Sequence, residues 1–117
     1  CLVGSEMCIR DSMRTLNHFG VPVNYKPEGA MYNEGLNVWL TDFSKSANKI
    51  EFIYLESGES PLPEKVLTTA HIAYQVPSLE EALKGQKVIF GPAVCDEHLT
   101  IAFIEEEGIA IELMEIK

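Results

Sequence analysis

Two histidines and two glutamates recur in similar surroundings in the two halves of the chain. His18 opens the segment HFGVPV and His71 opens HIAYQV, whereas Glu51 lies within KIEFIYLE and Glu112 within AIELMEIK. Apolar residues flank both glutamates, so each carboxylate is expected to enter a sheet, where an uncompensated charge is costly. The few lysines of the second half stand at segment ends. We therefore expect a divalent cation between the four side chains.

Imidazole and carboxylate groups are common ligands of divalent transition metals. This set of two histidines and two glutamates suits Zn, Ni, Co, Mn or Fe(II), and the ligand types alone do not choose among them. The alternative is a hydrogen-bonded structural network without a metal. Gly20 and Ala73 each follow a histidine by two residues on the same strand face. Their small side chains are expected to leave room for a ligand above the metal.

The elements that must position these residues are short segments of alternating hydrophobicity. Strands are predicted at residues 16–23, 36–43, 49–56, 71–76, 87–90, 99–105 and 109–116. A helix is predicted after Ser78, which forms a capping box with Glu81, and Gly85 suits its end. Residues 24–35 and 91–98 are rich in turn formers and are expected to be loops.

The second half therefore has the order βαβββ, and the first half has the same order with its helix reduced to a loop. Repeated motifs at similar offsets indicate an internal duplication. We predict one α+β domain over residues 13–117, in which paired βαβββ modules form an open, cup-shaped mixed sheet. The first, truncated module is expected at about 13–57, a polar linker with two prolines at about 57–66, and the second module at about 67–117.

Residues 1–12, CLVGSEMCIRDS, precede Met13 and show neither strand nor helix periodicity. They lack the apolar core of a signal peptide and resemble translated adapter sequence, so we expect a non-native leader. They contain two of the three cysteines, and the third is Cys95. Such a sparse set without CxxC spacing predicts neither a disulfide framework nor a structural zinc site, and it favours a cytoplasmic location.

The composition excludes two classes of partner. With 18 acidic and 9 basic residues the formal net charge is −9, which argues against nucleic-acid binding. No apolar run approaches the roughly 20 residues of a membrane-spanning helix, so no membrane partner is expected.

A second chemically suggestive group consists of Cys95, Asp96, Glu97 and His98. A polar turn explains it, with a cysteine nucleophile as the weaker alternative. The expected partner is a small-molecule substrate.

The paired segments HFGVPV/HIAYQV and IEFIYLE/IELMEI resemble the vicinal oxygen chelate superfamily. This superfamily includes glyoxalase I, methylmalonyl-CoA epimerase, ring-cleaving dioxygenases and the fosfomycin- and bleomycin-resistance proteins. The resemblance extends over residues 13–117 and is strongest in the second half. It implies paired βαβββ modules that curl into a cup, with metal ligands on the first and last strands of each module: His18, Glu51, His71 and Glu112. This ligand order is most similar to that of bacterial-type glyoxalase I.

The resemblance implies a metal-dependent lyase or isomerase that acts on a 2-oxo or hydroxyacyl compound through a metal-stabilised enediolate. Glu112 is the expected general base, with Glu51 second. The chain has no arginine after Arg14 to bind glutathione carboxylates. The alternative is a non-catalytic small-molecule-binding protein of the same fold, similar to bleomycin-resistance proteins. A homodimer would cover the sheet surface that the truncated first module leaves open.

Overall fold

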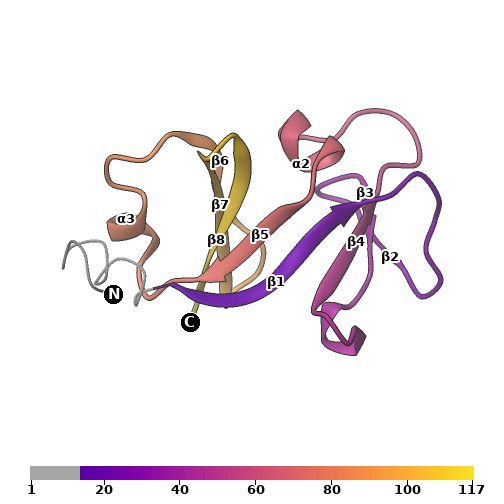
Figure 1. Cartoon of the computed structure of the whole chain (residues 1–117), viewed down its shortest axis with the longest axis horizontal. Coiled ribbons are helices and arrows are strands. Elements are labelled where there is room, and N and C mark those ends of the chain that lie inside the picture. Colours follow the sequence, from indigo (N-terminus) through magenta and orange to yellow (C-terminus); the bar gives the residue numbers. More distant parts are fainter. Residues whose placement is uncertain (1–13) are drawn as a thin grey trace.

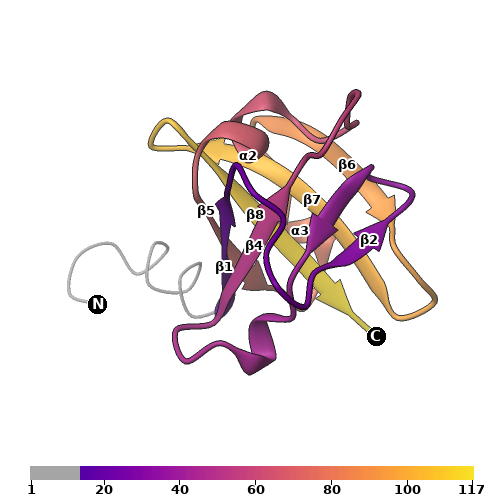
Figure 2. The ribbon, with the colours of Figure 1, turned by 90° about the vertical axis from the view of Figure 1, so that its right-hand side faces the viewer.

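The computed structural model describes residues 14–117, and the leader expected at residues 1–12 lies outside the described residues. Over the described part, eight strands form one mixed sheet in the order β2-β3-β4-β1-β5-β8-β7-β6. The sheet is strongly curled, like a half-barrel, and only short helices accompany it (Figures 1 and 2). The predicted α+β class with a curled mixed sheet is confirmed.

The elements follow the alternating segments of the sequence. The strands are β1 (Thr15–Pro22), β2 (Met31–Asn33), β3 (Val38–Leu40), β4 (Ile50–Tyr54), β5 (His71–Gln75), β6 (Val88–Val94), β7 (Leu99–Glu106) and β8 (Ile109–Ile116). The helices are the 3-10 helix η1 (Phe43–Lys45) and the α-helices α2 (Glu64–Thr68) and α3 (Leu79–Ala82). The side chain of Ser78 accepts a hydrogen bond from the backbone N–H of Glu81, so the predicted cap of α3 is confirmed.

The strands of the two halves have the same spatial order. In each half the first strand pairs in parallel with the last: β1 with β4, and β5 with β8. The remaining pairs within each half are antiparallel, and the halves join through an antiparallel pairing of β1 with β5. The four central strands are therefore β4, β1, β5 and β8. These are the strands on which the predicted metal ligands lie.

The two faces of the sheet have different cores. One buried cluster draws on both halves: Val38, Ile53, Leu62, Val66, Ala73, Ile101, Phe103, Ala110 and Met114. The second cluster lies beside α3: Val76, Leu79, Ala102, Ile104, Ile111 and Leu113. Consecutive residues of β7 alternate between the clusters, as the period of two in a strand requires. The predicted ligands share a face with the first cluster.

The segment 57–66, expected as a polar linker, contributes to the core. Leu62 is 7% exposed and Val66 is fully buried. The two side chains are four residues apart, and Val66 lies in α2, which packs beside β1 and β8. The sequence did not predict this contribution to the core, because the segment has only two buried apolar residues and they stand among prolines and charged residues. The segment is a packed connection and not a simple spacer.

Strand limits also differ from the expectations. β2 lies inside the expected loop 24–35, and β6 continues into the expected loop 91–98. Gly91 has a φ of +82°, and a Cβ there would lie 2.8 Å from the carbonyl oxygen of Ile101. The pairing of β6 with β7 shifts register around this residue, so turn formers are accommodated within the strand.

None of the described helices is long and apolar enough to cross a membrane.

Candidate metal centre

The structure brings the predicted ligands to one region of the four central strands: Glu51 on β4, His18 on β1, His71 on β5 and Glu112 on β8. The register explains this convergence. Gly20 pairs with Glu51 on one side and with His71 on the other. Ala73 pairs in the same way with His18 and Glu112. In each half, the residue two positions after the histidine is therefore paired with the glutamate.

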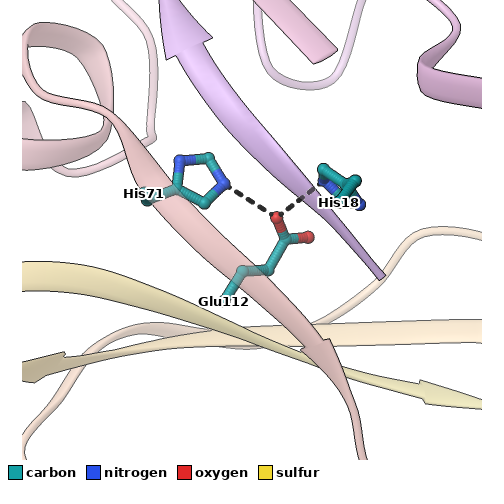
Figure 3. Close-up of side chains that lie close together, drawn as sticks. All are labelled: His18, His71 and Glu112. Atoms are coloured by element: carbon teal, nitrogen blue, oxygen red, sulfur yellow. Dashed lines mark hydrogen bonds and ion pairs between the residues drawn. The ribbon is translucent and has the colours of Figure 1, made fainter. Parts of the chain in front are cut away.

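His18, His71 and Glu112 form a tight, buried group. One possible ligand atom from each lies within 4.8 Å of those of the other two. The same carboxylate oxygen of Glu112 is 3.1 Å from Nε2 of His71 and 3.6 Å from Nε2 of His18 (Figure 3). Metal–ligand bonds of about 2.0–2.1 Å place neighbouring ligands of a tetrahedral shell about 3.3 Å apart. The group can therefore hold a metal ion with small side-chain adjustments.

Glu51 lies at the margin of this group. Its Oε1 is 3.7 Å from Nε2 of His18, and it is not part of the set in which all ligand atoms lie close together. Its side chain is 20% exposed, compared with 10% for Glu112. Burial raises the pKa of Glu51 to about 7; the Glu112 charge adds to this rise and His18 opposes it. Glu51 is thus a carboxylate that lacks a sufficient positive partner.

The pKa values of Glu112 and His18 are shifted toward the charged forms of these two groups. Burial alone would raise the pKa of Glu112, but the contacts with His18 and His71 outweigh it and lower the pKa. Burial alone would lower the pKa of His18, but the Glu112 contact and the charges of Glu51 and Glu112 raise it. Two carboxylates that face two imidazoles favour positive charge between them. A divalent cation supplies that charge.

A buried ring nitrogen of His18 tests whether the residues fit a metal. Nε2 of His18 and Nδ1 of His71 are buried without a hydrogen-bond partner among the described residues. Buried polar atoms normally have a partner, so each unpartnered one requires an explanation. Nε2 of His18 also lies within 3.7 Å of an oxygen of each carboxylate, 3.6 Å from Glu112 and 3.7 Å from Glu51. The donor set and this unpartnered nitrogen fit a divalent transition metal.

Aromatic rings hold the two imidazoles in place. Phe43, from η1, stacks on His18 with ring centroids 4.5 Å apart and an interplanar angle of 15°. Phe103, from β7, meets His71 edge to face at 5.1 Å. Neither phenylalanine was identified as a site residue from the sequence. Their distance from the histidines along the chain gives no local pattern that would have revealed these contacts.

Gly20 does not leave room for a ligand in the way that was expected. A Cβ at this position would lie 2.0 Å from Cε1 of His71. The imidazole of His71 therefore occupies the space above the glycine. Gly20 is therefore needed for the position of the His71 ring. The expectation that this glycine leaves room for a bound small molecule was wrong.

The second suggestive group, residues 95–98, forms an exposed turn between β6 and β7. Asp96 accepts hydrogen bonds from the backbone N–H groups of His98 and Leu99, which explains the acidic side chain. Cys95 is exposed and free, and burial, with smaller effects of Glu112 and Asp96, raises the pKa of its thiol. A raised pKa disfavours the reactive thiolate. The turn interpretation is therefore better supported than a nucleophile.

Comparisons with known proteins bear on the fold only. No family model matches the chain, and no curated protein matches it. The fold is similar to the crystal structure of a hypothetical protein from Bacillus halodurans C-125, with a TM-score of 0.60 and 23% sequence identity. The likeness covers 89% of this chain and 95% of that chain. The same arrangement of strands thus occurs in another protein, and the likeness assigns no activity.

Proposed function

We propose that the protein is a small metal-dependent lyase or isomerase of the vicinal oxygen chelate superfamily. The single observation that supports this best is the buried convergence of His18, His71 and Glu112 from three neighbouring strands. Each is at most 7% exposed. A hydrogen-bonded network alone does not account for them, because Nε2 of His18 lacks a hydrogen-bond partner among residues 14–117.

The repeated register supports two related modules. The parallel pairs Gly20–Glu51 and Ala73–Glu112 occupy equivalent places in the two halves, each two residues beyond a histidine. The second half contains α3 between its first two strands, and the first half has a loop there. These features agree with paired βαβββ modules whose first copy lost its helix.

The geometry favours Glu51 over Glu112 as the general base, which reverses the order expected from the sequence. Glu112 contacts both histidines and is the better ligand. Glu51 contacts only His18 among the site histidines, at 3.7 Å, and is the more exposed carboxylate. We assign His18, His71 and Glu112 to holding the metal and Glu51 to moving a proton.

The bound ion would supply Lewis acidity toward a carbonyl oxygen and so acidify the neighbouring C–H group. Glu51 would take the proton from that carbon and return it to the same or a neighbouring carbon. Return of the proton would isomerise a 2-oxo or hydroxyacyl compound. In a lyase reaction a leaving group would depart from the neighbouring carbon instead, and Glu51 would keep the proton until it passes to the leaving group or to water. Phe43 and Phe103 limit rotation of the histidine rings while this occurs.

Metal analysis of the purified protein tests this proposal. The protein is dialysed against Zn²⁺ or Co²⁺, separated from free metal and analysed for its elements. About one ion per chain is expected, with loss in Glu112→Gln and retention in Glu97→Gln, an exposed control in the 95–98 turn. A wild type that binds no metal, and whose stability is the same with and without added metal, would contradict the metal centre and favour the non-catalytic binding protein. Metal-dependent exchange of a substrate C–H with deuterated water, lost in Glu51→Gln, tests the proton transfer.

A further inference from the structure

His18 has a hydrogen-bond partner on the side of its ring that faces away from the carboxylates. Its Nδ1 lies 2.7 Å from Oδ1 of Asn17, the preceding residue. An amide oxygen can only accept a hydrogen bond, so in this contact the neutral imidazole carries its proton on Nδ1. The other nitrogen, Nε2, then has a free lone pair. Nε2 is the atom that faces Glu51 and Glu112.

A β-bulge makes this contact between sequence neighbours possible. Leu16 pairs with Tyr74 and His18 pairs with Ala73, so Asn17 is an extra residue without a pairing partner on β5. In a regular strand, consecutive side chains point to opposite faces, and Asn17 would point away from the imidazole. A bulge redirects side chains and is frequent beside active sites. Here it brings the amide oxygen to the ring of the next residue.

The opposite tautomer would leave a buried donor unsatisfied. Nε2 of His18 is 3.6 Å from Glu112 and 3.7 Å from Glu51, and these distances are too long for hydrogen bonds. A proton on Nε2 would therefore have no acceptor in the described part of the chain, at a cost of about 1–3 kcal/mol. A lone pair on Nε2 carries no such penalty when a cation lies between the carboxylates. Both ring nitrogens thus favour the proton on Nδ1.

We propose that Asn17 is a positioning residue for the metal centre: it holds His18 in the Nδ1–H tautomer, with Nε2 free to bind the ion. The inference rests on the proposed function, because it gives Nε2 the role of a metal ligand. Groups that hydrogen-bond to a metal-binding histidine fix its tautomer and orientation, and their loss typically lowers metal affinity about 10- to 100-fold.

The tautomer is measured directly in the metal-free protein by ¹⁵N NMR of labelled histidines at about pH 9, well above the ordinary imidazole pKa of about 6.5. We expect an Nδ1–H ring for His18 in the wild type and in Asn17→Asp, which keeps the acceptor oxygen. Asn17→Leu, which has a similar size and no acceptor, is expected to populate the Nε2–H form. Thr15→Val, a change at an exposed side chain of the same strand, serves as the control.

Affinity for Zn²⁺ is measured on the same proteins by competition with a chromophoric chelator. Asn17→Leu is expected to lose about 10- to 100-fold, with Asn17→Asp and Thr15→Val close to the wild type. An Nε2–H ring in the wild type would overturn the inference even if no variant folded. Unchanged affinity and tautomer in a folded Asn17→Leu would also overturn it. A wild type with the expected tautomer that fails to bind Zn²⁺ would contradict the metal centre and leave the tautomer assignment intact.

Discussion

Replacing Glu51 by glutamine is expected to stabilise the metal-free protein at alkaline pH. Burial raises the pKa of this carboxyl from its ordinary value of 4.5 to about 7. The folded state therefore holds a proton that the unfolded state releases at lower pH, and the stability from this group is lost as the pH rises through 7. Glutamine has the shape of the protonated acid and does not ionise, so it avoids this loss.

The magnitude follows from the two pKa values. The difference between 4.5 and about 7, at about 1.36 kcal/mol per pKa unit, gives about 3 kcal/mol as an upper limit. The side chain is 20% exposed, so the charge is only partly solvated. We expect Glu51→Gln and the wild type to be similarly stable near pH 4. At about pH 8.5 in chelator, the variant is expected to be more stable by up to about 3 kcal/mol.

Urea denaturation followed by circular dichroism measures this difference in a chelating buffer. Glu56→Gln, which changes an exposed carboxylate two residues beyond β4, is the matched control and should shift stability by less than about 0.5 kcal/mol. Saturating Zn²⁺ should reduce or reverse the advantage of Glu51→Gln, because a cation compensates the carboxylate of the wild type. The prediction concerns the difference in unfolding free energy between Glu51→Gln and the wild type. A difference that is no larger at about pH 8.5 than near pH 4 would refute it.

Three further outcomes are expected. Gly20→Ala should abolish Zn²⁺ binding measured by chelator competition, because its Cβ would meet the ring of His71 at 2.0 Å; Gly35→Ala, where the nearest atom is at 3.6 Å, should not. Val66→Ala should destabilise the protein to urea by about 2 kcal/mol, because Val66 is fully buried, and a change below about 0.5 kcal/mol would show that α2 is only a spacer. Zn²⁺ affinity should fall more than about 10-fold between pH 8 and pH 6 by calorimetry, since protons compete for the ligands; constant affinity would contradict binding by these side chains.

The convergence of the four predicted ligand residues could be predicted because it depends on local patterns. A histidine that opens a strand and a glutamate between apolar residues are visible in a single segment, and the alternation of β1 and β8 gives their faces. The repetition of both patterns then suggested that the segments meet. The pairings of Gly20 and Ala73 with the glutamates agree with that expectation.

Other parts of the site could not be predicted because they depend on contacts between distant segments. The proposed order of Glu51 and Glu112 as general base depends on which carboxylate contacts both histidines, and that requires the tertiary structure. The His71 ring above Gly20 depends on the register of β1 against β5. The bulge at Asn17 also depends on that pairing, because no turn former marks it in the sequence.

Anomalous diffraction from crystals of the Zn²⁺-loaded protein, recorded at the zinc absorption edge, tests the central claim most directly. The account predicts one ion bound by Nε2 of His18, Nε2 of His71 and a carboxylate oxygen of Glu112, at about 2.0–2.2 Å from each. An ion located elsewhere, or no ion between these three side chains at saturating Zn²⁺, would contradict it.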